Sequence, residues 1–266
     1  MAEKSRSNTI SLLALFISIL CLYFAVTTTT AAESDEVKLL YLTLVWPGAL
    51  CYSGQCCNPP VTGPQANDFL IEDLKAIDST GQIIQDCNES CNFDTDTMLD
   101  LGDELNPRWM NLNCTCDYTY GHRDTAWCRY GQCSKLPQHD YFQTAVNMTR
   151  RANLLNGFKV NNIEPSFVLY DLEYINTTLM ANIGFSTHLE CGTEVEIAQP
   201  LSKIGLCISA DGQSFINCPF EIKHKSCNTR HLLFLPFESD KLYDCLKNEA
   251  GSGGLIKMAT EKHLAM

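Results

Sequence analysis

The clearest hydrophobic feature of the chain is an apolar run near residue 40. The run reads L-L-Y-L-T-L-V-W over Leu39–Trp46 and is stopped by Pro47-Gly48. Apolar runs of this length that are rich in β-favouring residues and end in a turn pair are typical of buried strands. We therefore predict a buried strand over Leu39–Trp46.

Two later segments repeat their apolar residues at helical spacing. The first begins near Asp140, with Gly157 placed to end it, and its spaced positions are Phe142, Ala145, Val146, Thr149, Ala152 and Leu155. The second is followed by Gly184, and its spaced positions are Leu172, Ile175, Leu179 and Ile183. Recurrence at three and four residues with a glycine after the last apolar position predicts a helix in each segment.

A hairpin signal lies nearer the C-terminus. Two short β-favouring stretches, Gly205–Ser209 and Ser214–Cys218, flank the turn pair Asp211-Gly212. Asp-Gly between such stretches favours a tight turn, so Cys207 and Cys218 could bridge across a hairpin. The chain as a whole mixes strands and helices without an internal repeat.

The N-terminal segment decides the expected compartment. Lys4 and Arg6 precede an uncharged apolar run over Ile10–Val26, and small residues follow over Thr27–Ala32. This order is typical of a secretory signal peptide, which we place at residues 1–32. An uncleaved membrane anchor is the alternative, but the run is short for a span of about 20 residues. No second run of spanning length follows, so we expect no membrane association after cleavage.

Composition narrows the class of protein. The 266 residues are 45% hydrophobic and carry 31 acidic against 19 basic side chains, a net charge of −12. This balance disfavours a general nucleic-acid binder, which needs clustered Lys and Arg, and the apolar content disfavours a disordered acidic chain. One or two globular domains are expected.

The 15 cysteines are unusually many for this length. Cys21 leaves with the signal peptide, and an even set of fourteen in an oxidising compartment predicts disulfides rather than metal sites. Adjacent Cys56-Cys57 and the tight Cys114-x-Cys116 also disfavour structural zinc, and neither a metal nor a cofactor is expected. Four glycosylation sequons agree with secretion, of which Asn113 is doubtful because Cys114 can be bridged early; the sequons begin at Asn88, Asn113, Asn147 and Asn176.

Five motifs in order resemble the ribonuclease T2 family, in particular its plant secretory, S-like members. The motifs are W-P-G-A-L-C over 46–51, C-C-N-P over 56–59, Trp127 with G-Q-C-S over 131–134, Q-H-D-Y-F over 138–142, and the hairpin with Cys207 and Cys218. The resemblance runs from about Leu39 to Phe237. It implies an α+β fold in which an antiparallel sheet packs against several helices.

The resemblance places the family's catalytic residues in two segments, and neither segment is intact here. The first reads F-x-x-H-G-L-W-P in active members, and its match over Phe69–Ala76 has Glu72 for the histidine, Asp73 for the glycine and Lys75 for the tryptophan. The second reads H-E-W-x-K-H-G-T-C, and its match over Thr125–Cys133 keeps Trp127, Gly131 and Cys133. The family's two histidines, its glutamate and its lysine are replaced there by Thr125, Tyr130, Ala126 and Arg129.

These replacements remove groups that the family's reaction requires. Attack of a ribose 2′-hydroxyl needs a base, an acid for the leaving oxygen and positive charge on the phosphorane, and imidazole serves because its pKa lies near working pH. Hydroxyls at Thr125 and Tyr130 titrate far above that range, and Ala126 exchanges no protons. Glu72 could act as a base, but it stands beside Asp73 without a partner acid. Arg129 could still hold a phosphate.

Other residues offer weaker candidates for the lost chemistry. His122 is the histidine nearest to the altered motif, and we interpret it as a surface loop residue; a rescued catalytic base is the alternative. His139 is expected to cap or pack at a helix start, while His188, His224, His231 and His263 lie in regions that the family does not use for catalysis. Trp127 and Phe69 are expected in the core, with contact to a base as the alternative.

Similarity to the family suggests five disulfides. They are Cys51 with Cys56, Cys57 with Cys114 or Cys116, Cys87 with Cys133, Cys191 with Cys227, and Cys207 with Cys218. Cys91, Cys128, Cys245 and the remaining one of Cys114 and Cys116 are extra, and their pairing stays open. Cys128 lies inside the former catalytic segment, where a bridge would lock the cleft; a free buried thiol is the alternative.

These observations predict a secreted or vacuolar glycoprotein with a degenerate catalytic site. Residues 33–237 form the ribonuclease-like domain, and residues 238–266, with Gly251–Gly254 as a linker, form an extension that we expect to be flexible. A storage role and an interaction role both fit, the latter with RNA, a nucleotide or a protein bound weakly at the old cleft. A residual endoribonuclease that cleaves RNA through 2′,3′-cyclic phosphates is the alternative.

Overall fold

The predicted strand near residue 40 lies in the middle of the main sheet. Strand β1 covers Leu39–Val45, and all seven of its residues are buried. Trp46 follows it, also buried, and its indole Nε1 donates a hydrogen bond of 2.7 Å to the Leu235 carbonyl. The short helix α2 then begins at Pro47 and covers Pro47–Tyr52. The strand prediction is confirmed.

The structure is a computed structural model that describes most of the chain between residues 36 and 244. The described residues are 36–52, 56–58, 67–110, 112, 119–195, 198–219, 222, 226–238 and 242–244. The predicted signal peptide, Asn113, Cys114, Cys116, Cys245 and the Gly251–Gly254 linker lie outside them. Within the described residues, no helix has both the length and the apolar character needed to cross a membrane.

The main sheet is mixed rather than antiparallel. Its strands run in the order β4-β3-β1-β7-β8-β5, and β6 pairs with β7. Pairing is antiparallel except between β7 and β8. Residues 210–230 separate these two strands, enough chain to return to the start of β7 and run parallel to it. The strands are β3 (Leu70–Ile77), β4 (Ile83–Ile84), β5 (Ser166–Asp171), β6 (His188–Cys191), β7 (Gln199–Ser209) and β8 (His231–Phe234).

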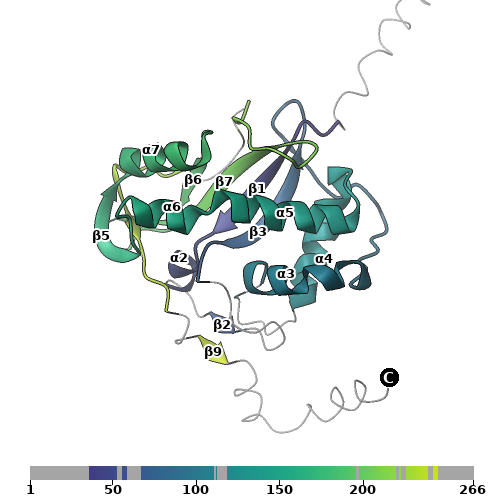
Figure 1. Cartoon of the computed structure of the whole chain (residues 1–266), viewed down its shortest axis with the longest axis horizontal. Helices are drawn as coiled ribbons and strands as arrows, with labels where there is room; N and C mark the ends of the chain where they lie inside the picture. The colour runs from purple at the N-terminus through teal and green to yellow at the C-terminus, as the bar shows by residue number, and fades with distance from the viewer. Residues whose placement is uncertain are drawn as a thin grey trace, which may run out of the picture. The chain divides into compact units, whose positions relative to one another are not determined.

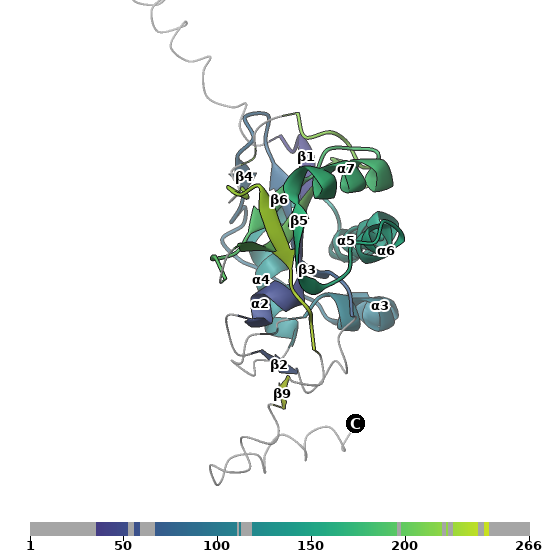
Figure 2. The same ribbon diagram turned by 90° about the vertical axis from the view of Figure 1, so that its left-hand side faces the viewer.

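Helices gather on one side of this sheet, as Figures 1 and 2 show for α3, α5, α6 and α7. The largest buried cluster includes residues of both layers, such as Leu42, Ile71, Phe142 and Leu179. The α+β fold is therefore as predicted, apart from the parallel pair. The remaining helices are η1 (Asp96–Leu101), α3 (Gly102–Arg108), α4 (Thr119–Arg129), η2 (Gly131–Ser134), α5 (Gln138–Ala152), α6 (Leu154–Val160) and α7 (Leu172–Ile183).

The first predicted helix is in fact two helices. Asn153 lies between α5 and α6 in the left-handed region, with φ of 44°, and breaks the run. Gly157 does not end a helix but lies buried within α6, where an added Cβ would come within 2.6 Å of the Asn182 side chain. The glycine is therefore needed for close packing of α6 on α7.

The second helix and the hairpin are confirmed. Helix α7 ends at Ile183, and Gly184 caps it with φ of 83°. At the hairpin, Gly212 has φ of 74° and the Ser209 N–H donates to the Ser214 carbonyl at 2.8 Å. The second arm contributes only an isolated bridge, Ile208 with Phe215, rather than a strand.

A short strand lies within the predicted C-terminal extension. Strand β9 (Tyr243–Asp244) pairs in parallel with β2 (Cys57–Asn58). The pairing brings residues after Phe237 back beside the cysteine pair at 56–57. The flexibility of the extension as a whole stays a prediction.

Candidate functional site

Strand β3 carries the first altered catalytic segment, and a bulge lies at its centre. Thr43 of β1 faces Asp73, whereas the next residue, Leu44, faces Ile71, so Glu72 is left without a partner in the register. Ile71 and Leu74 belong to the main core. The bulge therefore presents two consecutive carboxylates, Glu72 and Asp73, between core residues.

Glu72 forms an ion pair with a lysine from a different strand. Lys203 of β7 places its Nζ 2.7 Å from Glu72 Oε1, across the intervening strand β1. Both side chains are about one third exposed, at 30% and 32%. The group at the family's first histidine position is therefore a carboxylate whose charge is matched within the chain.

Asp73 and Lys75 form a second, more buried pair. Lys75 Nζ lies 2.8 Å from Asp73 Oδ2, with side-chain exposures of only 18% and 11%. Burial raises the pKa of Asp73, against the opposing effect of Lys75. Burial also acts to lower the pKa of Lys75, but the Asp73 carboxylate outweighs it and the pKa lies above its usual value. The resemblance matches Asp73 to a glycine of the family and Lys75 to a tryptophan. These two positions thus hold one ion pair.

Tyr130 connects this strand to the second altered segment. Lys75 Nζ lies 5.4 Å from the centre of the Tyr130 ring, and the Arg129 guanidinium lies 5.3 Å from it. The Tyr130 ring, at the position that the resemblance matches to the last histidine of the second motif, therefore lies near two cations. Thr125 is exposed and Ala126 is buried, so the other two altered positions offer no acid or base beside Glu72.

His122 lies at this site, contrary to the prediction of a surface loop. It belongs to α4, one helical turn before Thr125, and is half-buried. Burial lowers its pKa, while the nearby Glu72 and Asp73 act to raise it. The prediction failed because Gly121 and the polar residues around it give no helical pattern in the sequence. Helix α4 nevertheless forms there and places His122 near Glu72 and Asp73 of β3.

Arg123 is a structural residue that the sequence did not reveal. It is only 2% exposed, and its Nε donates to the Trp109 carbonyl at 3.1 Å. Its Nη1 and Nη2 both lie 3.1 Å from Asn106 Oδ1. The guanidinium therefore fixes α4 against α3 and holds His122 in place.

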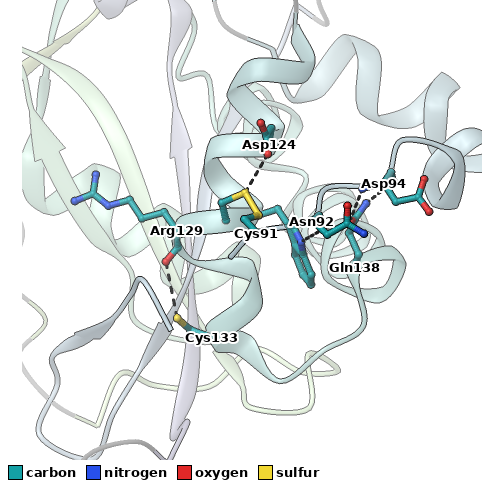
Figure 3. Close-up of a disulfide and its surroundings, with 9 residues drawn as sticks. Cys91, Asn92, Asp94, Asp124, Arg129, Cys133 and Gln138 are labelled. Carbon is teal, nitrogen blue, oxygen red and sulfur yellow. Dashed lines mark hydrogen bonds between the residues drawn. A yellow bond between two sulfur atoms is a disulfide. The ribbon is translucent and has the colours of Figure 1, made fainter. Parts of the chain in front are cut away.

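An additional disulfide crosses the second altered segment. Cys91, in the loop before η1, is bonded to Cys128 of α4, and Cys128 Sγ lies 3.0 Å from Asp124 Oδ1 (Figure 3). Cys91, Asp124 and Cys128 are close enough to hold a metal, but the two sulfurs are joined to each other. Arg129 extends away from the bridge (Figure 3). Among the pairings that the sequence left open, Cys128 is therefore bonded to Cys91 and is not a free thiol. The disulfide ties α4 to the loop before η1.

The family-implied disulfides that fall within the described residues are confirmed. Cys57 is also bridged, but its suggested partners, Cys114 and Cys116, lie outside the described residues. The confirmed pairs are Cys51–Cys56, Cys87–Cys133, Cys191–Cys227 and Cys207–Cys218.

Trp127 and Phe69, the two aromatic residues that match the family motifs, belong to the core as predicted. Trp127 is 8% exposed, and its Nε1 donates to the Asn92 carbonyl at 3.1 Å. Phe69 is 1% exposed and its ring stacks on Phe234, with centroids 6.0 Å apart. Contact of either ring with a nucleic-acid base stays a prediction.

The remaining described histidines lie away from the altered segments. His139, in the first turn of α5, places its Nε2 3.0 Å from Asp100 Oδ2 of η1, so it packs at a helix start as expected. His188 of β6 shares a hydrogen bond of 3.2 Å with the Tyr41 hydroxyl. Neither residue supplies an acid or base beside Glu72.

The structure is a disulfide-stabilised α+β protein in which strand β3 lies beside Tyr130, so the two segments that the resemblance matches to catalytic motifs are neighbours. Comparison with known proteins gives the family: the Ribonuclease T2 family profile matches residues 37–218, and the chain belongs to that family. Ribonuclease 3 of Arabidopsis thaliana is 33% identical over 74% of this chain and 89% of its own length. Extracellular ribonuclease LE of Solanum lycopersicum is 26% identical, over 79% and 91%.

Solved structures agree with this assignment. RNase NT in complex with 5′-AMP superposes with a TM-score of 0.71 at 26% identity, over 76% of this chain and all of that one. The ribonuclease MC1 from bitter gourd seeds gives 0.63 at 24% identity, over 74% and 100%, a likeness of fold alone. The relatives are named ribonucleases, and the altered segments of this chain bear on whether it acts as one.

Proposed function

We propose that this chain is a secreted, disulfide-rich member of the ribonuclease T2 family that does not cleave RNA. The observation that carries the proposal is the pairing of Glu72 with Lys203 and of Asp73 with Lys75, at 2.7 and 2.8 Å. Lysines that could have faced a phosphate are neutralised by carboxylates of the same chain. The lysines of the segment that would bind and cleave an anionic substrate are thus already paired with Glu72 and Asp73.

The missing proton-transfer groups support the same conclusion. A positioned acid or base contributes about 10²–10⁴ in rate. Glu72 and Tyr130 stand where the resemblance places two imidazoles, and neither a carboxylate nor a phenol is the proton-transfer group that the family's reaction uses there. Even with non-additive effects, loss of both groups would remove most of the acceleration.

The direct test is an activity assay on the full chain secreted from a eukaryotic host. The expected result is RNA cleavage no faster than in buffer at any pH from about 4.5 to 7.5, with a plant relative such as ribonuclease LE as the positive control. A Glu72→His/Tyr130→His variant serves as a matched second sample, because it returns two imidazoles to the site. Turnover by the unaltered chain comparable to the relative would overturn the proposal.

A residual endoribonuclease is the second candidate, and the position of His122 favours it. A half-buried imidazole with a lowered pKa beside Glu72 is neutral near pH 7 and can accept a proton. If His122 serves as the base for attack of the 2′-hydroxyl, activity with 2′,3′-cyclic phosphate products should fall at least tenfold in His122→Gln. An equal residual rate in His122→Gln and the unaltered chain would point to a contaminating enzyme instead.

For the role without catalysis, we favour accumulation as a storage protein in the extracellular space or in a vacuole reached through the secretory pathway. The alternative is weak binding of RNA, a nucleotide or a protein, with exposed Arg129 as the available cation. Titration with 5′-AMP and short RNA distinguishes the two roles. Storage predicts no saturable binding, whereas binding that Arg129→Ala abolishes would support the interaction role.

A further inference from the structure

A polar groove lies between helix α5 and the hairpin turn, and it shares no lining residue with the candidate site. The cavity has a volume of about 710 Å³, which is within the range of ligand pockets, roughly 300–1,000 Å³. Asp140, Gln143, Asn147 and Arg151 follow one side of α5 at steps of three or four residues. At 1.5 Å per residue, the helical wall is about 16 Å long.

The opposite wall, Asp211–Gln213, is held firmly in place. The Cys207–Cys218 disulfide closes the hairpin that carries it, and Asp211 Oδ1 accepts from the Gln213 N–H at 3.0 Å. Arg151 of α5 donates to the Gln213 carbonyl at 2.5 Å. An added Cβ on Gly212 would lie 2.8 Å from the Thr144 side chain, so the turn contacts α5 closely. The groove is therefore a preformed feature of the fold.

One side chain on the helical wall is a glycosylation acceptor. Asn147 is exposed, lines the groove and begins the sequon Asn147-Met148-Thr149. We propose that the first sugars of an N-linked glycan on Asn147 lie in this groove and bridge α5 to the hairpin turn. The proposal requires passage through the secretory pathway, with which the disulfides agree, and it does not depend on whether the chain cleaves RNA.

The lining chemistry suits an N-acetylhexosamine. Asp140 and Asp211 offer carboxylate acceptors to sugar hydroxyls, and Gln143 offers an amide that both donates and accepts. Half-buried Leu136 provides an apolar surface for an acetyl methyl group or a ring face. Acceptors, donors and a small apolar area are thus placed along one groove that is also lined by Asn147.

The other described acceptors provide internal controls. Asn88 is exposed in a loop, and Asn176 is half-buried on α7. Neither lines the groove. A glycan at Asn88 should therefore remain accessible to an endoglycosidase in the native protein, whereas a glycan seated in the groove should not.

The experiment uses the full chain secreted from a eukaryotic host and follows glycan release at each site by peptide mass spectrometry. Native protein should lose the Asn147 glycan at least tenfold more slowly than protein that has been reduced and denatured, while release at Asn88 should differ little between the two states. Gln143→Trp fills the groove at an exposed helical position and should make native release at Asn147 fast. Lys159→Trp, on exposed α6 surface outside the groove, should leave it slow.

Three results would overturn the proposal. Asn147 could be recovered without a glycan, its glycan could be released equally fast from native and denatured protein, or protection could persist in Gln143→Trp. Because each readout compares one site in two states of the same protein, incomplete modification at Asn88 would not affect the conclusion.

Discussion

At the scale of single residues, strand β3 carries charged pairs at positions that the resemblance matches to a catalytic motif. Asp73 and Lys75 replace a glycine and a tryptophan of the family pattern and form one mostly buried pair. Neither change is tolerable alone, since an isolated buried carboxylate or ammonium loses solvation without compensation. The two side chains therefore act as one pair, in which each compensates the other's loss of solvation.

Equivalent substitutions in the two ion pairs should have unequal effects. Lys75→Met keeps most of the side-chain volume but leaves Asp73 buried without its cation, and we expect a loss of about 2–4 kcal/mol in the free energy of unfolding. Lys203→Met breaks a pair that is about one third exposed, and solvent screening should limit the loss to about 1 kcal/mol or less. Urea unfolding at pH 7 measures both, and equal losses would contradict the assigned burial.

The sequence revealed some of these residues and not others, for a physical reason. Glu72, Asp73 and Tyr130 could be identified because each replaces a residue within a short motif. The Lys203 partner of Glu72 is 131 positions away along the chain, and only the pairing of β7 beside β1 brings the two together. The prediction of a surface loop for His122 was wrong because its orientation depends on helix α4. The residues around it show no helical spacing of apolar positions.

At the scale of secondary-structure elements, the Cys91–Cys128 disulfide joins the loop before η1 to helix α4. It closes a segment of 37 residues, and bridges of this length contribute about 2–4 kcal/mol, mainly by restricting the unfolded chain. The double variant Cys91→Ser/Cys128→Ser should therefore unfold at a lower urea concentration.

A matched comparison isolates the effect of segment length. Cys207→Ser/Cys218→Ser removes a bridge across only 11 residues, and the entropic model predicts a smaller loss for it. Thermal unfolding of the two variants, with the number of free thiols counted chemically, gives the ranking. An unchanged midpoint in Cys91→Ser/Cys128→Ser would mean that the bridge does not constrain α4.

The contact between η1 and α5 should make stability depend on pH. The hydrogen bond with Asp100 raises the pKa of His139, and the same bond lowers the pKa of Asp100. The histidine's contribution is therefore complete below about pH 6.5 and disappears as pH rises through its raised pKa; the carboxylate's contribution is present above about pH 4 and is lost on further acidification. The contact stabilises the fold between these limits.

His139→Gln tests this dependence because it keeps a polar side chain without a titrating ring. The unfolding free energy of the unaltered chain minus that of the variant should be largest near pH 5–6 and should shrink between pH 6.5 and 8. Subtracting the profiles removes the opposite contribution of His122, whose pKa is lowered and which destabilises the fold on acidification. Asp100→Asn should give a difference profile of the same direction but smaller size, because Asp140 also raises the pKa of His139, and a profile without slope would exclude the contact as its source.

Element boundaries were predictable where local signals decide them. Helix α7 was predictable from the spacing of its apolar residues and from the glycine that follows them. The structure shows that this glycine, Gly184, caps the helix with a positive φ. The break at Asn153 was missed because an asparagine in the left-handed region does not interrupt the apolar spacing that continues through α6. The parallel pairing of β8 was missed because it depends on how the chain returns after the hairpin, which no local pattern records.

At the scale of the whole molecule, net charge and exposed apolar residues, including those of strand β5, should govern how copies interact. The net charge of −12 at pH 7 should keep molecules apart, but the sequence pI is about 4.9. Strand β5 lies at an end of the described sheet order, and a register shift in it leaves Phe167 and Val168 63% and 61% exposed. The Val168 N–H bonds to Ser166 Oγ at 3.3 Å, so this N–H is not a free donor at the strand edge.

Loss of charge near pH 5 should therefore produce reversible self-association through this apolar segment. Light scattering should report monomers at pH 7.5 and larger species near pH 5, and Phe167→Ser/Val168→Ser should reduce the association. Leu99→Ser is the matched control, since Leu99 is 75% exposed on η1, away from β5 in the chain. Association that responds equally to both variants would implicate general loss of charge. Monomers at every pH would count against accumulation in acidic compartments. The neutral molecule would then lack an attractive surface strong enough to hold copies together.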